Sequence, residues 1–216
     1  MDRQMLYFRR NRLIVALVQT FFESLHVLRN RSIYSFSPNW IKRRHLLYLV
    51  KENRISQFIE SGTYLGQTCR LIARKFPDTL VDTIEVDENL FNYLRHSEKG
   101  KDSNIRYWKG DSRVVLKELL DIRFHDRTLF WLDGHYSQGI TSSGLSETPL
   151  FDELSIIQDY LQNSNAKCMI VIDDVNNLDK NPNYPTNTFI KDFAFSNDFV
   201  MLKFQNIFVL KPKAWN

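Results

Sequence analysis

The sequence has no long apolar run. The longest, residues 13–18, is only six residues long and is followed by Gln19, Glu23 and His26. A helix that crosses a bilayer needs ~20 largely apolar residues, so we expect no transmembrane segment. The N-terminal region also lacks a small-residue cleavage site after an apolar core, which disfavours a secretory signal.

Cysteine is scarce, since only Cys69 and Cys168 are present among 216 residues. Two cysteines do not make a disulfide framework, and they fit reduced thiols in a cytoplasmic protein. The hydrophobic share of 43% and the charged share of 25% are ordinary for a globular protein with a sizeable core. We therefore expect one cytoplasmic domain with an extension.

Charge is unevenly distributed along the chain. Residues 1–54 carry eleven Lys or Arg and three acids, a net charge of +8, whereas residues 55–216 carry a net charge of −4. The basic segment is predicted to contain helices at 5–28 and about 39–52, and it is either a solvated surface or a contact for phosphate, a membrane surface or a partner. An apolar stripe with Phe22 and Leu25 favours a lid or a homodimer contact for the first helix.

From residue 55 onward, short apolar runs alternate with amphipathic segments. This alternation predicts a parallel sheet covered by helices on both faces. Two final strands with almost nothing between them must pair antiparallel. The expected strands are 56–60, 80–86, 104–108, 128–132, 168–173, 199–204 and 206–211, and the expected helices are 65–76, 88–97, 112–120 and 149–163.

The first expected strand runs into Glu60, Gly62, Thr63 and Gly66. The two glycines allow a tight turn and a close approach of backbone to a ligand at a helix N-terminus. The middle glycine of a dinucleotide fingerprint is missing, which disfavours a nicotinamide cofactor. A purely structural turn is the alternative.

Acids also follow the second and third expected strands. Glu85 stands twenty-three residues after Gly62, close to where an acid that binds ribose hydroxyls is expected. Asp87 is better explained as the N-cap of the next helix. Asp111 could accept a hydrogen bond from an adenine amino group, while Ser112 could cap the following helix.

The strongest pattern is the pair of acidic clusters after the fourth and fifth strands. Asp133 follows one, and Asp173 and Asp174 follow the other. Parallel strands bring these acids to the same edge, where they repel one another unless something positive lies between them. A hard divalent cation such as Mg²⁺ meets that need, whereas zinc would require more Cys or His. Helix capping is the structural alternative.

Residues 55–211 together resemble the class I, Rossmann-like S-adenosylmethionine-dependent methyltransferases. Within these they resemble the metal-dependent macrocin-type sugar O-methyltransferases of antibiotic and polysaccharide pathways. The resemblance implies a three-layer sandwich with a mostly parallel seven-stranded sheet. It implies Mg²⁺ at Asp133, Asp173 and Asp174. It also implies that S-adenosylmethionine is contacted by Glu60, Gly62, Thr63, Gly66, Glu85, Asp111, Ser112 and Asp133.

The sequence departs from that family at His135, which stands where the family has a catalytic Asp after Asp-Gly. Histidine suits a general base because its unperturbed pKa, about 6.5, lies near neutral pH. We therefore expect metal-assisted methyl transfer to a hydroxyl of a sugar, glycan or other small acceptor, with His135 as the base.

Two other functions remain open from the sequence. A nucleic-acid methyltransferase would use the basic extension on phosphates, but clustered acids would repel a phosphate backbone. A non-catalytic scaffold would dock through the same extension to a membrane or a partner, but it would have no need of the acids. The acceptor and the oligomeric state do not follow from the sequence.

Overall fold

A seven-stranded sheet forms the centre of the computed structural model, which describes residues 39–97, 103–122, 125, 127–133, 148–180 and 182–215. The strand order is β3-β2-β1-β4-β5-β7-β6. The first five strands are parallel, and β7 pairs antiparallel with both β5 and β6. Their bounds are β1 Gln57–Ser61, β2 Leu80–Glu85, β3 Ile105–Lys109, β4 Thr128–Leu132, β5 Cys168–Ile172, β6 Phe199–Phe204 and β7 Ile207–Pro212.

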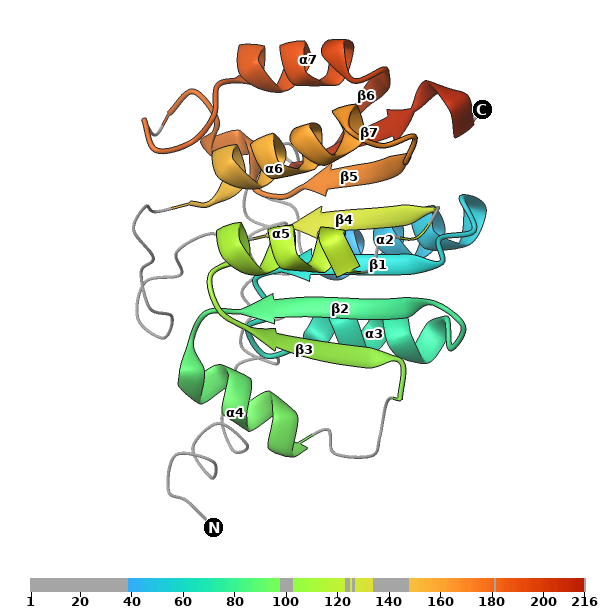
Figure 1. Cartoon of the computed structure of the whole chain (residues 1–216), viewed down its shortest axis with the longest axis vertical. Coiled ribbons are helices and arrows are strands. Elements are labelled where there is room, and N and C mark those ends of the chain that lie inside the picture. The colour runs from blue at the N-terminus through green and yellow to red at the C-terminus, as the bar shows by residue number, and fades with distance from the viewer. Residues whose placement is uncertain are drawn as a thin grey trace, which may run out of the picture.

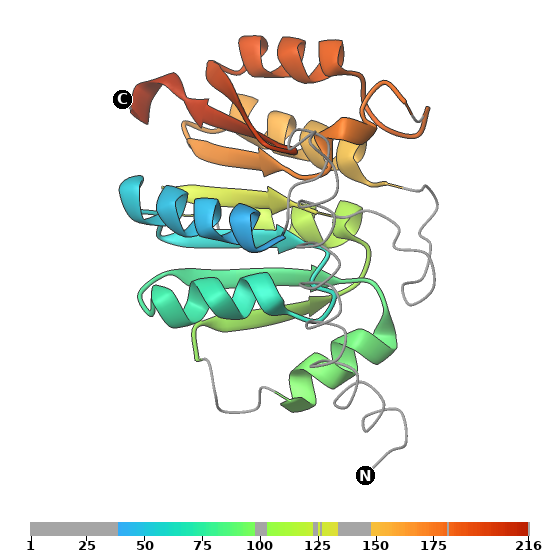
Figure 2. The same ribbon diagram turned by 180° about the vertical axis from the view of Figure 1, so that it is seen from behind.

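Helices cover both faces, giving three layers (Figures 1 and 2). One face carries α2 and α3, the other carries α5, α6 and α7, and α4 lies beside the β3 edge. The helices are α2 Asn39–Glu52, α3 Gln67–Lys75, α4 Glu88–Ser97, α5 Ser112–Ile122, α6 Leu150–Gln162 and α7 Asn187–Ser196, with short 3₁₀ turns η1 Val175–Asn177 and η2 Lys213–Trp215.

The central strands are buried on both faces because helices cover them. Every residue of β1, β4 and β5 is buried, so β4 and β5 read as continuous apolar runs rather than alternating patterns. Alternate residues of each strand pack into opposite layers. Phe130 and Ile170 lie in the core with α5, α6 and α7, while Leu129 and Met169 lie in the core with α2 and α3.

Helix α2 belongs to the same core although it lies before residue 55. Leu46, Leu49 and Val50 pack against Phe58 of β1 and Ile72 of α3. Residues 1–38 of the predicted extension, including the expected helix 5–28, lie outside the described residues. The division into 1–54 and 55–216 therefore stays a prediction, but its second helix is part of the folded layer structure.

The predicted fold class is confirmed: the sheet is mostly parallel and ends in an antiparallel hairpin. Helix α7 was not predicted, although Thr186 caps it by accepting a hydrogen bond from the backbone N–H of Phe189 at 3.1 Å. None of the helices in the described part of the chain is long and apolar enough to cross a membrane.

Candidate functional site

Each of the five parallel strands is followed by, or ends in, an acid at the same edge of the sheet. In sheet order these acids are Asp111 after β3, Glu85 of β2, Glu60 of β1, Asp133 after β4 and Asp173 after β5. The arrows of these strands all point to this edge in Figure 1. Ligands of open α/β sheets bind outside the carboxyl ends of the strands, where the strand order reverses. Here the reversal lies between β1 and β4.

The loop between β1 and α3 turns tightly at both predicted glycines. Gly62 has φ 85° and Gly66 has φ 66°, a region that side chains with a Cβ rarely adopt. A Cβ on Gly66 would also lie 2.9 Å from Cδ2 of Leu94, so this glycine is required by helix packing as well as by the turn. The first of the two is therefore the better candidate for close approach to a ligand.

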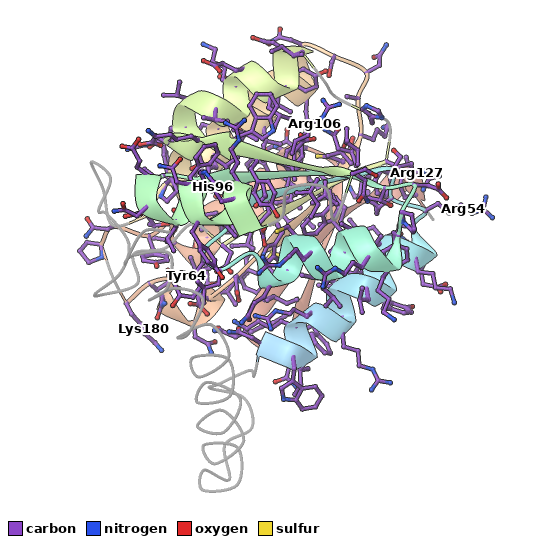
Figure 3. The ribbon with its side chains drawn as sticks, turned by 90° about the horizontal axis from the view of Figure 1, so that it is seen from below. Arg54, Tyr64, His96, Arg106, Arg127 and Lys180 are labelled. Carbon is purple, nitrogen blue, oxygen red and sulfur yellow. The ribbon has the colours of Figure 1, made fainter. Side chains whose placement is uncertain are left out.

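Glu85 anchors this loop to the neighbouring strand. Its carboxylate accepts hydrogen bonds from the backbone N–H of Tyr64 and of Asp87, each at 2.8 Å. Figure 3 shows Tyr64 at the end of the molecule opposite to Arg54 and Arg127. Burial raises the pKa of Glu85 to about 7, and the two backbone donors act against that rise. The acid is thus held in a fixed orientation at the rim.

Glu60 is buried one strand away, and hydroxyls surround it. Thr83 donates to its carboxylate at 2.6 Å, and the Thr63 hydroxyl lies 2.7 Å from that of Thr83. Burial raises the pKa of Glu60 to about 8, with the charge of Asp133 adding to the effect and that of Arg43 opposing it. Thr63, which follows Gly62, is therefore linked to Glu60 through the hydroxyl of Thr83.

At the β3 end, the capping roles differ from the prediction. Asp111, rather than Ser112, caps α5, because its carboxylate accepts from the backbone N–H of Arg113 at 3.0 Å and Ser112 is already the first helical residue. The Arg113 guanidinium also binds this carboxylate and holds its pKa below the usual range. Asp87 caps α4 as expected, accepting from Leu90 at 2.9 Å.

The acids after β5 are fixed by the β6–β7 turn. Asp174 has φ 53°, and its backbone N–H donates to Asp173 Oδ1 at 2.7 Å. Asn206 in that turn donates to Asp174 Oδ1 at 2.9 Å and accepts from the backbone N–H of Asn176 at 2.8 Å. Neither acid caps a helix through its side chain in the way that the structural alternative required.

A lysine that the sequence pattern did not single out lies at these two acids. Lys42 of α2 donates from Nζ to Asp173 Oδ1 at 2.6 Å and to Asp174 Oδ1 at 3.2 Å, and only 5% of the residue is exposed. Its neighbour on the helix, Arg43, donates to Gln67 at 2.6 Å. Helix α2 therefore places two cations over the acidic edge of the sheet.

The predicted metal-binding residues do not fit a divalent ion in this arrangement. Asp173 Oδ1 and Asp174 Oδ1 each already accept two N–H donors, and one donor to both is the Lys42 ammonium. Mg²⁺ needs free oxygen ligands at about 2.0–2.1 Å. Among the residues that the structure describes, no group of three or more His, Cys, Asp or Glu is placed to hold a metal.

The electrostatics of this cluster leave an excess of negative charge. Burial lowers the pKa of Lys42, but the charges of Asp173 and Asp174 outweigh that effect and raise it. Burial and the charge of Asp133 raise the pKa of Asp173 to about 8, while Lys42 acts against them. The pKa of Lys42 rises because its ammonium faces several carboxyl groups, whereas that of Asp173 rises chiefly through burial. The site therefore still favours a further positive charge.

Glu153 of α6 is a second residue that the sequence analysis missed. It is fully buried, and neither carboxylate oxygen has a hydrogen-bond partner among the described residues. Burial raises its pKa to about 7, and the hydroxyls of Ser112 and Ser61 lie near enough to oppose the rise without making a well-formed hydrogen bond. Glu153 lines a small pocket with Asp133, Asp173 and Asp174.

Both missed residues could have been found from helical periodicity. Lys42 lies four residues before Leu46. Glu153 lies three residues after Leu150 and four before Ile157. Each therefore falls on the buried stripe of its helix. A charged residue on an apolar stripe must find a partner or a function. The predicted catalytic His135 follows Asp133 by two positions but lies outside the described residues.

No protein-family model and no curated protein matches this sequence, but solved structures share its fold. A candidate caffeoyl-CoA O-methyltransferase of Staphylococcus aureus matches with a TM-score of 0.56 at 15% identity, over 90% of this chain and 99% of that one. The Podospora anserina methyltransferase PaMTH1, solved with S-adenosylhomocysteine, matches with a TM-score of 0.56 at 12% identity, over 90% and 87%.

A third similar structure is the O-methyltransferase TomG from Streptomyces achromogenes, involved in tomaymycin synthesis and solved with S-adenosylmethionine. It matches with a TM-score of 0.53 at 16% identity, over 90% of this chain and 96% of that one. All three matches span most of both chains. The chain therefore has the Rossmann-like fold of the class I S-adenosylmethionine-dependent methyltransferases.

Proposed function

We propose that this protein is an S-adenosylmethionine-dependent O-methyltransferase that acts on a hydroxyl of a sugar, glycan or other small acceptor. The observation that carries the proposal is the row of acids along the carboxyl ends of five adjacent strands. The cofactor offers complementary groups: a cationic sulfonium, an ammonium, two ribose hydroxyls and an adenine amino group.

The row of acids suits that cofactor from one end to the other. In this proposal Asp111 accepts from the adenine amino group and Glu85 from the ribose hydroxyls. Glu60 and Asp133 face the amino-acid portion, beside the turn at Gly62. The raised pKa of Glu60 supports the last of these contacts, because a buried carboxyl that lacks a nearby cation holds its proton more tightly than an exposed one.

The proposed chemistry is a direct displacement. The acceptor oxygen attacks the methyl carbon, the carbon–sulfur bond breaks, and its electron pair stays on sulfur, so S-adenosylhomocysteine leaves. The hydroxyl proton passes to a base, for which the sequence proposes His135. The predicted assistance by a divalent metal is not part of this mechanism, because Lys42 engages the acids that would hold the ion.

A nucleic-acid substrate is less well supported. The pocket is lined by Asp133, Glu153, Asp173 and Asp174, and these groups would repel a phosphate backbone. A neutral polyhydroxyl acceptor has no such conflict. This is why we favour a sugar or glycan hydroxyl, as the resemblance in sequence also implies.

Cofactor binding is tested by calorimetry on the full chain with S-adenosylmethionine and S-adenosylhomocysteine. We expect both to bind, and Glu85→Gln to weaken binding by about tenfold or more, because hydrogen bonds to a charged group contribute ~1.5–3 kcal/mol. Glu88→Gln is the matched control, since Glu88 lies in exposed contact with Lys109. If neither ligand binds the wild-type protein, the proposal is wrong.

The base is tested by turnover with a labelled methyl donor and a panel of glycosides. His135→Ala should lower turnover by ~100-fold or more while cofactor affinity stays within error, as expected for the loss of a general base. Activity of the wild type should fall as the pH drops below the histidine pKa, because a base must be unprotonated. An unimpaired His135→Ala enzyme would assign the proton to another group.

A further inference from the structure

We propose that Lys42 is a built-in cation that takes the place of a divalent metal in the acidic cluster of Asp133, Asp173 and Asp174. The cluster requires a positive partner, since three carboxyl groups at one edge of the sheet repel one another. The chain itself supplies that partner from α2. The ammonium binds Asp173 Oδ1 at 2.6 Å and Asp174 Oδ1 at 3.2 Å.

Lys42 does not reach this position as a mobile surface side chain. Its stem lies on the buried stripe of α2, which Leu46, Leu49 and Val50 fix in the core. The next residue, Arg43, ties the same turn of the helix to Gln67 of α3. Because the buried residues of α2 and the Arg43–Gln67 hydrogen bond already fix the helix, Lys42 loses little conformational entropy when it pairs with the acids. An exposed ion pair must offset a larger loss of entropy.

The acceptors are equally fixed. Asp173 Oδ1 accepts from Lys42 and from the backbone N–H of Asp174, and Asp174 Oδ1 accepts from Lys42 and from Asn206. Two donors satisfy the lone pairs of each of these oxygens. A divalent ion that bound these two oxygens would have to displace the ammonium and leave it buried without a partner, which is strongly unfavourable.

The charge balance also distinguishes this site from a metal centre. One ammonium supplies half the charge of Mg²⁺ and leaves the cluster with a net negative charge. That remainder suits a cationic methyl donor, and the ammonium reduces repulsion between the acids and an acceptor oxygen that gains negative charge. This catalytic consequence rests on the proposed function, whereas exclusion of the metal does not.

Metal binding is tested first on the wild-type full chain with Mn²⁺ alone, by calorimetry and by electron paramagnetic resonance of the free ion. We expect no stoichiometric binding. Lys42→Met removes the charge while keeping an unbranched apolar stem of similar length, and Lys42→Ala clears the space. Each variant should bind one equivalent of Mn²⁺ at least about tenfold more tightly than the wild type, because the carboxylates then lack a cation.

Lys51→Ala is the matched control, because Lys51 is an exposed lysine of the same helix and its loss should leave Mn²⁺ binding at the wild-type level. Stoichiometric Mn²⁺ binding by the wild type overturns the proposal, whether or not the variants fold. So does a folded Lys42 variant that binds no Mn²⁺. If methyl transfer is detected, it should persist in excess chelator, and its loss there would overturn the proposal while leaving the proposed function intact.

Discussion

The two ends of the parallel strands treat buried polar groups in opposite ways. At the amino end and along β2, buried polar side chains form hydrogen bonds with one another. Gln57 donates to Asp82 at 2.9 Å and accepts from Thr128 and from the backbone N–H of His125, both at 3.1 Å. At the carboxyl end, Glu153 lacks a hydrogen-bond partner and Asp173 shares one lysine with Asp174.

The contrast extends to loops. At the amino end, the Asn104 amide donates to the carbonyls of Ala73, Phe76 and Thr79. These bonds connect the start of β3 to the end of α3 and the turn between α3 and β2. Arg54 and Arg127 lie at that end (Figure 3). The Arg127 guanidinium lies 4.8 Å from the centre of the Trp215 ring. Satisfied polar groups stabilise a fold, whereas crowded acids destabilise it unless a ligand compensates. The difference is consistent with the proposed site at the carboxyl end.

The largest effect should come from breaking the amino-end network. Gln57→Leu conserves most of the volume but removes the amide that binds Asp82, Thr128 and the backbone N–H of His125, so a buried Asp82 oxygen loses its donor. The Trp108 indole, at 2.9 Å, still donates to the other oxygen of that carboxylate. We expect a loss of about 3–4 kcal/mol of stability in urea unfolding, because an uncompensated buried charge is costly.

Cofactor affinity is the second measurement on the same variant. Gln57 lies at the opposite end of β1 from Glu60, so S-adenosylmethionine should bind the folded variant with unchanged affinity. A variant as stable as the wild type would show that the amino-end network does not stabilise the fold. A large loss of affinity in a folded variant would show that the two ends are coupled.

A smaller effect of opposite sign should come from the carboxyl end. The pKa of Glu153 is raised from 4.5 to about 7 by burial, so the folded state holds its proton more tightly than the unfolded state does. Its charged form therefore costs stability as the pH rises above about 4.5, and the cost is complete above about pH 7. Glu153→Gln should be more stable than the wild type at pH 8, by on the order of 3 kcal/mol.

The pH dependence separates this effect from a general gain. Well below pH 4.5, the variant and the wild type should differ little, because the glutamate is then protonated in both states. Glu118→Gln on the exposed face of α5 is the control and should change stability little at either pH. Equal stability of Glu153→Gln and the wild type at pH 8 would mean that a donor satisfies this carboxylate.

Much of the fold and part of the site could be predicted from the sequence. Short apolar runs and period-3.6 patterns are local, so α2, α4 and the parallel strands were placed within a residue or two. The positions of Gly62, Glu85 and Asp173 at one edge followed from the rule that parallel strands end together. The left-handed φ of Gly62 and the cap at Asp87 were likewise readable from local chemistry.

The partners of those acids could not be predicted in the same way. The interpretation of three carboxylates as a metal site was sound in its charge balance, since they do require a cation. Which cation fills the space depends on how α2 packs across the sheet, and Lys42 reaches Asp173 over a separation of 131 residues. On α2 the apolar residue Trp40 is 52% exposed, whereas the charged residue Lys42 lies on the buried stripe.

The sequence by itself determined the order of the strands and of every helix but α7, the edge of the sheet at which acids gather and the need for positive charge there. These depend on short-range periodicity and on the direction of parallel strands. Only the tertiary structure decided that Lys42 pairs with Asp173 and Asp174 and that Glu153 lies buried beside them. Long-range packing fixes which face of each helix turns inward, and burial then sets how strongly each charge is felt.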